Sequence, residues 1–267
     1  AYEAATADLK DVIQIDPYHL EAYGEIAINY NRDIENFPIL KRMLDRIMGA
    51  DAYKSPTDMG VNCIKDGIID DEVCRQAAKQ EIIRRYLNAQ FEYKKYMLNG
   101  DELANIRRLM DELNLKAEER VSTKAARERK EKIFNEEGIV KNITALELED
   151  GRVITGKESE LMDSAAAALL NALKLISGLP DELHMIDPAI LNPILDMKRD
   201  IEKNSNTQLN LEEVLISLAT SQMYNPSAKV SIGNLKRLSG LKGHSTGMLP
   251  SIDYELFRKL SIDITSD

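Results

Sequence analysis

The stretch TALELEDGRVIT, residues 144–155, decides the fold of the carboxy-terminal part of the chain. Its first half alternates apolar and polar residues, which is typical of a strand with one covered face. The pair Asp150-Gly151 is a strong signal for a two-residue hairpin turn. The stretch therefore predicts an antiparallel hairpin with strands at 144–149 and 152–155.

Helices and short strands alternate after this hairpin. An alanine- and leucine-rich helix is expected at 164–177, where Gly178 ends it and its leucines cover a sheet. Such alternation predicts an α/β domain over residues 139–267. The other elements expected there are helices at 188–199, 211–224, 226–238 and 253–260, and strands at 183–186, 245–249 and 262–265.

The chain before the hairpin has helical periodicity throughout. Apolar residues recur every three or four positions at 34–48, 71–98 and 103–113, and a highly charged helix is expected at about 118–137. We predict a connector at 1–50 and a helical module at 51–138. The predicted fold class is α+β or α/β, with the helical module followed by a small α/β sandwich-like domain.

Composition limits the classes of function. Of the 267 residues, 43% are hydrophobic and 30% are charged, which is ordinary for a globular protein. The formal net charge of −10 repels phosphate backbones and anionic lipids, so neither nucleic acid nor membrane is expected as a partner. The sequence contains no membrane-spanning run and no secretory leader, so we predict a cytoplasmic protein. Ala1 in place of a methionine suggests that the chain starts within a longer protein.

Metal binding is not predicted. The histidines His19, His184 and His244 are scattered, and the two cysteines, Cys63 and Cys74, do not have the spacing of a zinc site. We therefore assign no metal ligands and name no cofactor.

A partial phosphate-loop pattern ends at Lys157. Glu158 stands where such a loop needs a serine or threonine for magnesium, and β-branched Val153 and Ile154 occupy the middle of the pattern. We reject a nucleotide loop here and retain Lys157 alone as an anion-binding residue.

Three polar segments at element boundaries supply the candidate site. Arg32 could clamp a phosphate or carboxylate beside Asn31 and Asp33, although a structural arginine fits equally well. Thr57, Asp58 and Asn62 lie in a loop punctuated by glycine and proline.

The third segment is His244 with Ser245 and Thr246, which offers an imidazole and two hydroxyls for acid/base and anion-binding roles. Its alternative is a loop histidine beside hydroxyls that cap backbone amides. We assign catalytic roles to His244 and Asp58, and we expect the loops around Arg32, Thr57 and His244 to line one concavity.

Several segments resemble the bacterial domain-of-unknown-function family 1846. They are AYEAATADL (1–9), NYNRDIE (29–35), SPTDMGVN (55–62), TGK (155–157) and HST (244–246). The resemblance implies that this chain is the carboxy-terminal half, because full-length members look about twice as long. Their amino-terminal half carries a glycine-rich segment similar to a phosphate loop, which would make that missing half a partner. The chain departs from the family at 63–67, which is more polar, and in ending at Asp267 before an aromatic tail.

Three functional hypotheses follow. The first is the accessory half of a cytoplasmic nucleotide- or phosphate-dependent enzyme. The second is a non-catalytic scaffold that pairs with a second copy through Tyr86, Tyr93 and Tyr96, because aromatic residues are favoured at interfaces. The third is a deaminase-like metal enzyme, which would require bound zinc. The sequence does not decide whether the chain is an enzyme.

Overall fold

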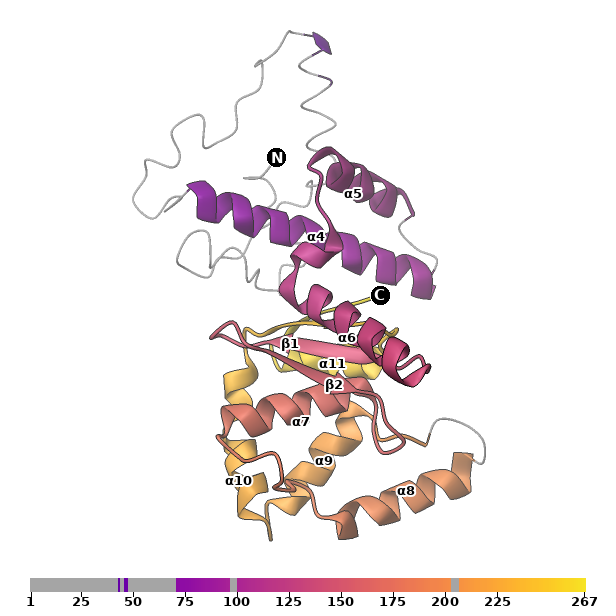
Figure 1. Ribbon diagram of the computed structural model, residues 1–267, viewed down its shortest axis with the longest axis vertical. Helices are drawn as coiled ribbons and strands as arrows, with labels where there is room; N and C mark the ends of the chain where they lie inside the picture. Colours follow the sequence, from indigo (N-terminus) through magenta and orange to yellow (C-terminus); the bar gives the residue numbers. More distant parts are fainter. Residues whose placement is uncertain (1–42, 44–45, 48–70, 97–99, 203–206) are drawn as a thin grey trace. The chain divides into compact units, whose positions relative to one another are not determined.

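The computed structural model describes residues 43, 46–47, 71–96, 100–202 and 207–267. The chain divides into two compact units, Ala1–Arg120 and Val121–Asp267 (Figure 1). Helices combine with a four-stranded mixed sheet, so the α+β class predicted from the sequence is confirmed. The predicted connector at 1–50 lies almost wholly outside the described residues. No helix in the described part combines the length and the hydropathy that a membrane crossing requires.

The described part of the first unit is helical. It contains α4 (Asp71–Tyr96), α5 (Gly100–Glu112) and the 3₁₀ helix η2 (Ala117–Glu119). Helices α4 and α5 pack through a small apolar core that includes Ile82 and Ile106, both fully buried. Acidic residues at the start of α5 lie favourably near the positive end of its dipole.

The second unit contains the sheet, with strand order β2-β1-β3-β4. The central strand β1 pairs antiparallel with both β2 and β3, and β3 pairs parallel with β4. The hairpin predicted from residues 144–155 is confirmed, and its Gly151 has a φ of 79°, a value that favours glycine. The strands are β1 (Ile143–Glu147), β2 (Val153–Lys157), β3 (Lys242–Ser245) and β4 (Asp263–Ser266).

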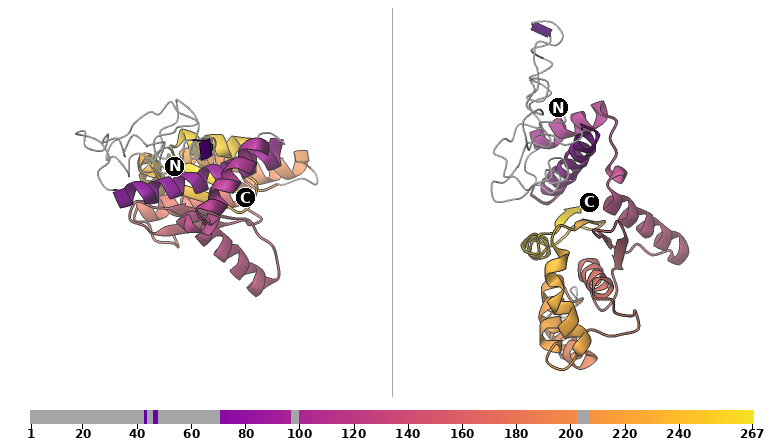
Figure 2. Two further views of the ribbon diagram at one scale, coloured as in Figure 1. Left: turned by 90° about the horizontal axis from the view of Figure 1, so that it is seen from above. Right: turned by 90° about the vertical axis from the view of Figure 1, so that its left-hand side faces the viewer.

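Helices cover both faces of this sheet. Helix α6 packs on one face, against β1, β2 and β3, and α7 packs on the other, against β1 and β2 (Figure 2). Helix α11 connects the parallel strands β3 and β4 and contacts α9. The helices are α6 (Val121–Glu137), α7 (Ser164–Ile176), α8 (Pro188–Glu202), α9 (Leu211–Ser221), α10 (Pro226–Gly233), the 3₁₀ helix η3 (Leu235–Leu238) and α11 (Ser251–Lys259).

Three expectations differ from the structure in this unit. Residues 183–186 form no strand, because Met185 and Ile186 enter the core from an irregular segment without a neighbouring strand to pair with. The strand expected at 245–249 lies earlier, at Lys242–Ser245, where it pairs with β1. The charged helix at 121–137, placed in the helical module from its sequence, lies in the same compact unit as the sheet.

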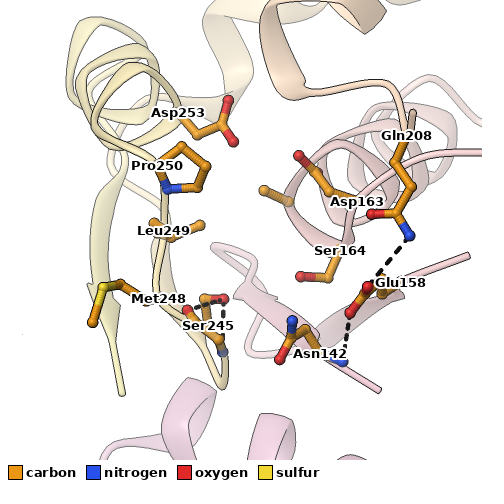
Figure 3. Close-up of a pocket in the computed structure, with 12 residues that line it drawn as sticks. Asn142, Glu158, Asp163, Ser164, Gln208, Ser245, Met248, Leu249, Pro250 and Asp253 are labelled. Carbon is orange, nitrogen blue, oxygen red and sulfur yellow. Dashed lines mark hydrogen bonds between the residues drawn. The ribbon is translucent and has the colours of Figure 1, made fainter. Parts of the chain in front are cut away.

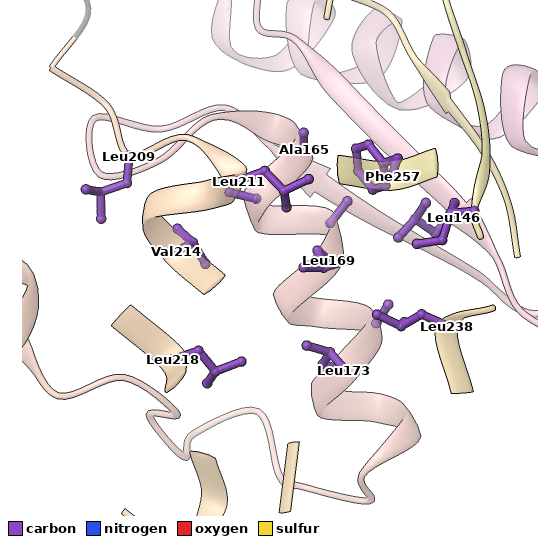
Figure 4. Packing of buried hydrophobic residues seen from close by; sticks show 14 of the residues in the cluster. Leu146, Ala165, Leu169, Leu173, Leu209, Leu211, Val214, Leu218, Leu238 and Phe257 are labelled. Carbon is purple, nitrogen blue, oxygen red and sulfur yellow. The ribbon is translucent and has the colours of Figure 1, made fainter. Parts of the chain in front are cut away.

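The main core lies between the sheet and helices α7, α9 and α11. Leu146 of β1, Leu169 of α7, Val214 of α9 and Phe257 of α11 are all fully buried within it (Figure 4). Full burial of each such side chain contributes about 1.5–3 kcal/mol. A smaller core on the opposite face joins Ile143 of β1 to Ala126 and Ile133 of α6. The alternation of β1 thus delivers side chains to two cores rather than to one core and solvent.

Gly156 of β2 marks the closest approach of a helix to the sheet. A Cβ at this position would lie 2.1 Å from the backbone nitrogen of Ala168 and 2.5 Å from the carbonyl oxygen of Ser164. Both atoms belong to the backbone of α7, so a rotamer change cannot make room. Glycine is therefore required for α7 to lie directly on β2.

Replacement of Gly156 by alanine tests this contact. We expect Gly156→Ala to lower the free energy of unfolding by about 1–3 kcal/mol, because the added methyl separates strand and helix. Gly233→Ala is the matched control, since its Cβ would meet no atom within 4 Å in α10. Chemical denaturation of both variants measures the difference, and equal stabilities would contradict the close packing.

Candidate functional site

A cavity of about 130 Å³ opens in the second unit where the amino-terminal ends of α7 and α11 lie beside the sheet (Figure 3). Its walls come from the ends of β1, β2 and β3 and from the segments that lead into α7, α9 and α11. Polar side chains contribute much of the lining. They are Asn142, Glu158, Asp163, Ser164, Gln208, Ser245 and Asp253.

Asp163 is the N-cap of α7. Its Oδ1 accepts a hydrogen bond of 2.7 Å from the backbone nitrogen of Ala166, which satisfies one of the free amides of the first turn. Its own backbone nitrogen donates to the carbonyl oxygen of Leu209, so the segment before α9 holds it in place. Burial raises the pKa of Asp163, and the hydrogen bond from Ala166 opposes this only in part.

Asp253 lies in the first turn of α11 and is fully buried. Its Oδ1 accepts a hydrogen bond of 3.3 Å from the backbone nitrogen of Leu211 at the start of α9. Its Oδ2 has no hydrogen-bond partner among the described residues. The carboxyl points across the cavity toward Asp163 (Figure 3). Burial, and then the charge of Asp163, raise the pKa of Asp253 to about 7.

Glu158 and Gln208 form the opposite wall. The two oxygens of Glu158 accept hydrogen bonds from the backbone nitrogen of Asn142 and from Nε2 of Gln208, at 3.1 and 3.3 Å. Nε2 of Gln208 also donates to the carbonyl oxygen of Ser159 at 2.6 Å. Nζ of Lys198 donates to the carbonyl oxygen of Gln208, also at 2.6 Å. These contacts fix the segment before α9 beside the end of β2.

The ionisable side chains that line the cavity are all acidic. Three carboxyl groups border the cavity, and its described lining contains no lysine, arginine or histidine. Glu213 of α9 adds negative charge near Asp253, although it is paired with Lys198 at 2.8 Å. Such a site repels phosphate and attracts donors of hydrogen bonds and positive charge.

His244 lies on the other face of β3. Its Nδ1 is 2.9 Å from Oγ1 of Thr265, and its Nε2 is 3.3 Å from Oδ1 of Asp267. The Thr265 hydroxyl donates to the carbonyl oxygen of Gly243, so its oxygen is the acceptor for Nδ1. Both ring nitrogens therefore lie near oxygen atoms.

Asp267 joins His244 to α6 through Arg127. The guanidinium of Arg127 contacts both carboxylate oxygens of Asp267, including a contact of 3.2 Å from Nε to Oδ2. Burial acts to raise the pKa of Asp267, but hydrogen bonds from His244 and Arg127 outweigh it and hold the pKa well below its ordinary value. This partly buried group ties α6 to β3 and β4.

The other candidates at the sheet have separate surroundings. Ser245 lines the cavity, where its hydroxyl donates to the carbonyl oxygen of Gly247. Oγ1 of Thr246 accepts from the backbone nitrogen of Ile143 at 3.0 Å. Lys157 is exposed and pairs with Glu137 at 3.2 Å. Of the four described candidates, the structure brings only Ser245 into the cavity.

The remaining predicted site residues lie outside the described residues. They are Asn31, Arg32, Asp33, Thr57, Asp58 and Asn62. The expected concavity shared by Arg32, Thr57 and His244, and the catalytic roles of His244 and Asp58, stay predictions. Residues such as Asp163 and Asp253 were missed because each is an ordinary acidic residue at a helix start. Their sequence signal is that of capping, and nothing local indicates that the two meet.

The family follows from comparison with known proteins. The model described as "Domain of unknown function DUF1846, N-terminal" matches residues 1–114, and its C-terminal counterpart matches residues 118–267. The chain belongs to the DUF1846 family. The matches do not support the expectation of a carboxy-terminal half with a missing amino-terminal partner, because this DUF1846 chain carries both domains. No group of three potential metal ligands lies among the residues that the structure describes.

Bacterial proteins named UPF0371 protein are similar to this DUF1846 chain over its whole length. Those of Clostridium tetani (strain Massachusetts / E88) and Clostridium botulinum (strain Langeland / NCTC 10281 / Type F) are 48% and 47% identical. That of Fusobacterium nucleatum subsp. nucleatum is 48% identical. The chain covers 54% of the length of each, so it spans about half of these relatives.

Removal of the Asp267 carboxylate tests the partly buried ionic group. We expect Asp267→Asn to lower the free energy of unfolding by about 2 kcal/mol at pH 6, because His244 and Arg127 lose their shared acceptor. The folded-state pKa of Asp267 is lowered, so its contribution is present above the ordinary value near 4 and disappears as the pH falls below it. Denaturation at several pH values from 6 to 3 measures the free energy of unfolding of both proteins, and the difference between them should become smaller as the pH falls.

The control for this series is Asp196→Asn in the exposed pair with Arg199. Exposed pairs contribute little, so this variant should match the unmodified chain at each pH. If the difference in free energy of unfolding between Asp267→Asn and the unmodified chain stays constant down to pH 3, the lowered pKa of Asp267 is contradicted.

The effect of replacing Asp253 on stability should depend on pH in the opposite sense to that of replacing Asp267. Its folded-state pKa is raised to about 7, so ionisation costs stability as the pH rises from about 4 through 7. We expect Asp253→Asn, which mimics the protonated acid, to be nearly neutral at pH 4 and to raise the free energy of unfolding by roughly 1–4 kcal/mol at pH 8. Thermal denaturation at both pH values measures this, and destabilisation at pH 8 would count against the raised pKa.

Proposed function

We propose that the cavity of the second unit is an acid–base site for a small polar ligand. In this proposal Asp253 and Asp163 hold one proton between them and exchange it with the ligand. The observation that carries the proposal is the pair of carboxyls that face each other at the cavity. Oδ2 of Asp253 is buried and meets no donor among the described residues, so either a proton shared with Asp163 or a donor from a ligand must satisfy it. An unsatisfied buried polar atom costs free energy, which a bound ligand would recover.

The surroundings of the two carboxyls support different roles. Asp163 accepts an amide hydrogen bond at the positive end of α7, and this stabilises its ionised form. Asp253 is the more buried of the pair, and repulsion from Asp163 keeps the proton on it. The pKa values of both carboxyls are raised, that of Asp253 to about 7, as is usual for two carboxyls that share one proton in a buried site.

The pKa of Asp253 suits proton transfer at neutral pH. A group with a pKa of about 7 is present in both protonation states in comparable amounts at pH 7. General acid–base catalysis is most efficient when the catalytic pKa lies near the working pH. Asp253 can therefore act as a donor or as an acceptor without a large change in conditions.

The functions expected from the sequence are carried forward as proposals for the whole protein. A nucleotide- or phosphate-dependent enzyme in the cytoplasm would have to bind its phosphate elsewhere, because the lining of this cavity is acidic. Pairing with a second copy would use Tyr93 and Tyr96, whose side chains are 38% and 51% exposed.

Carboxyl titration followed by NMR tests the acid–base proposal. With ¹³C-labelled aspartate, we expect one carboxyl carbon to titrate near pH 7, and Asp253→Asn identifies that resonance by its loss. The variant Asp163→Asn keeps an N-cap residue for α7 but removes the charge that faces Asp253. The titration midpoint of Asp253 should then move toward the ordinary value near 4.

Glu149→Gln is the control for that titration. It removes one negative charge from an exposed position in the hairpin turn, outside the cavity lining. Its Asp253 midpoint should match that of the unmodified chain. An Asp253 carboxyl that titrates near pH 4 in the unmodified chain would overturn the proposed function.

A further inference from the structure

The free hydrogen-bonding capacity of the cavity is that of an acceptor. Asp253 is fully buried in the lining, its carboxyl points toward Asp163, and its Oδ2 meets no hydrogen-bond donor among the described residues (Figure 3). Asp163 faces it, and Glu158 borders the same space, so three carboxyl groups surround one small volume. The described lining supplies no cationic side chain to balance them. A ligand that completes this site must bring both hydrogen-bond donors and positive charge.

We propose that the cavity binds the primary ammonium group of a small organic amine, with Oδ2 of Asp253 as its principal acceptor. This inference rests on the proposed acid–base function and names the class of ligand for it. A primary ammonium has three N–H donors and no acceptor, which matches a lining rich in carboxylate oxygens. Hydrogen bonds between an ammonium and a carboxylate are stronger than those between neutral groups.

The size of the cavity fits such a head group. Its volume is about 130 Å³. One water molecule takes up about 30 Å³ of liquid volume, so there is room for a group of only a few heavy atoms. The rest of a larger amine would extend through the open side of the cavity.

A metal ion and an anion suit the cavity less well. The three carboxyl groups border the cavity but are not placed to hold one metal ion together, since the described residues contain no group of three potential ligands. Glu158 is also held by the backbone nitrogen of Asn142 and by Gln208, so its oxygens are already engaged. Phosphate would add negative charge beside three carboxyls, and neutral hydroxyls would leave their charge unbalanced.

Ammonium binding is coupled to the proton on Asp253. The charged groups near this carboxyl are Asp163 before α7, Glu158 after β2 and Glu213 of α9, which pairs with Lys198 of α8. Strand β4 contributes no ionisable side chain to the lining. All three acids favour the bound cation, so binding displaces the proton from Asp253. Affinity should therefore rise with pH until Asp253 is fully ionised.

The experiment is an NMR titration of the full 267-residue chain with ethylammonium chloride at pH 6 and pH 8. We expect a millimolar Kd, as befits a ligand of three heavy atoms, reported by the Asp253 carboxyl carbon and by the amide of Gly247. The affinity should be about tenfold higher at pH 8, because one carboxyl with a pKa near 7 must lose its proton. Ethylene glycol, tetramethylammonium and inorganic phosphate are the comparison ligands, and each should bind at least tenfold more weakly.

Two variants separate specific binding from general attraction to an acidic protein. Asp253→Asn should abolish ethylammonium binding, and its folding is checked by the amide spectrum. Glu149→Gln removes the same charge away from the cavity and should bind as the unmodified chain does. Equal affinity in Asp253→Asn, or tighter binding of phosphate or ethylene glycol than of ethylammonium, would overturn the inference.

The same spectra distinguish this inference from the function on which it rests. If Asp253 titrates near pH 7 but ethylammonium leaves its resonance unchanged, the acid–base site stands and the amine assignment fails. If Asp253 titrates near pH 4 in the absence of any ligand, the proposed function fails as well. Binding that is present at pH 8 and independent of Asp253 contradicts the assigned acceptor.

Discussion

The contact between Gly156 and the start of α7 is the constraint on which the second unit depends. Because β2 has no side chain at this point, the backbone of α7 rests on the strand itself. A hydrogen bond of 2.9 Å between the hydroxyls of Thr144 and Ser164 holds the same end of the helix to β1. The N-cap Asp163 is thereby fixed at the border of the sheet, where the segments before α9 and α11 also arrive. The close packing of α7 on β2 therefore positions both the helix that fills the core and the residues that line the cavity.

Two carboxyl groups of the second unit have opposite surroundings and opposite pKa shifts. Asp267 receives hydrogen bonds from Arg127 and His244, and its pKa is lowered. Asp253 receives one amide hydrogen bond and faces another acid, and its pKa is raised. The first arrangement satisfies its charge and stabilises the contact of α6 with the sheet. The second leaves a carboxyl that gains from any ligand able to donate to it.

The acid pair also has a structural side. Asp163 and Asp253 each accept from an amide at a helix start, so both contribute to helix capping as well as to the cavity. Burial and the nearby charge of Asp163 disfavour the ionised form of Asp253, and its pKa is raised to about 7. Asparagine could also cap a helix at such a position, so capping alone does not explain the acid at Asp253.

The sequence by itself determined the local features of this protein. The Asp150-Gly151 turn, the alternation around it and the helix expected at 164–177 are short-range signals, and each was predicted correctly. Which face of the sheet α6 would cover, and whether 183–186 would find a strand to pair with, depended on distant partners. The meeting of Asp163 with Asp253 was likewise decided only by the tertiary structure. Turn geometry and helical periodicity act over a few residues, whereas the cavity forms from segments that only the packing of α7 on β2 brings together.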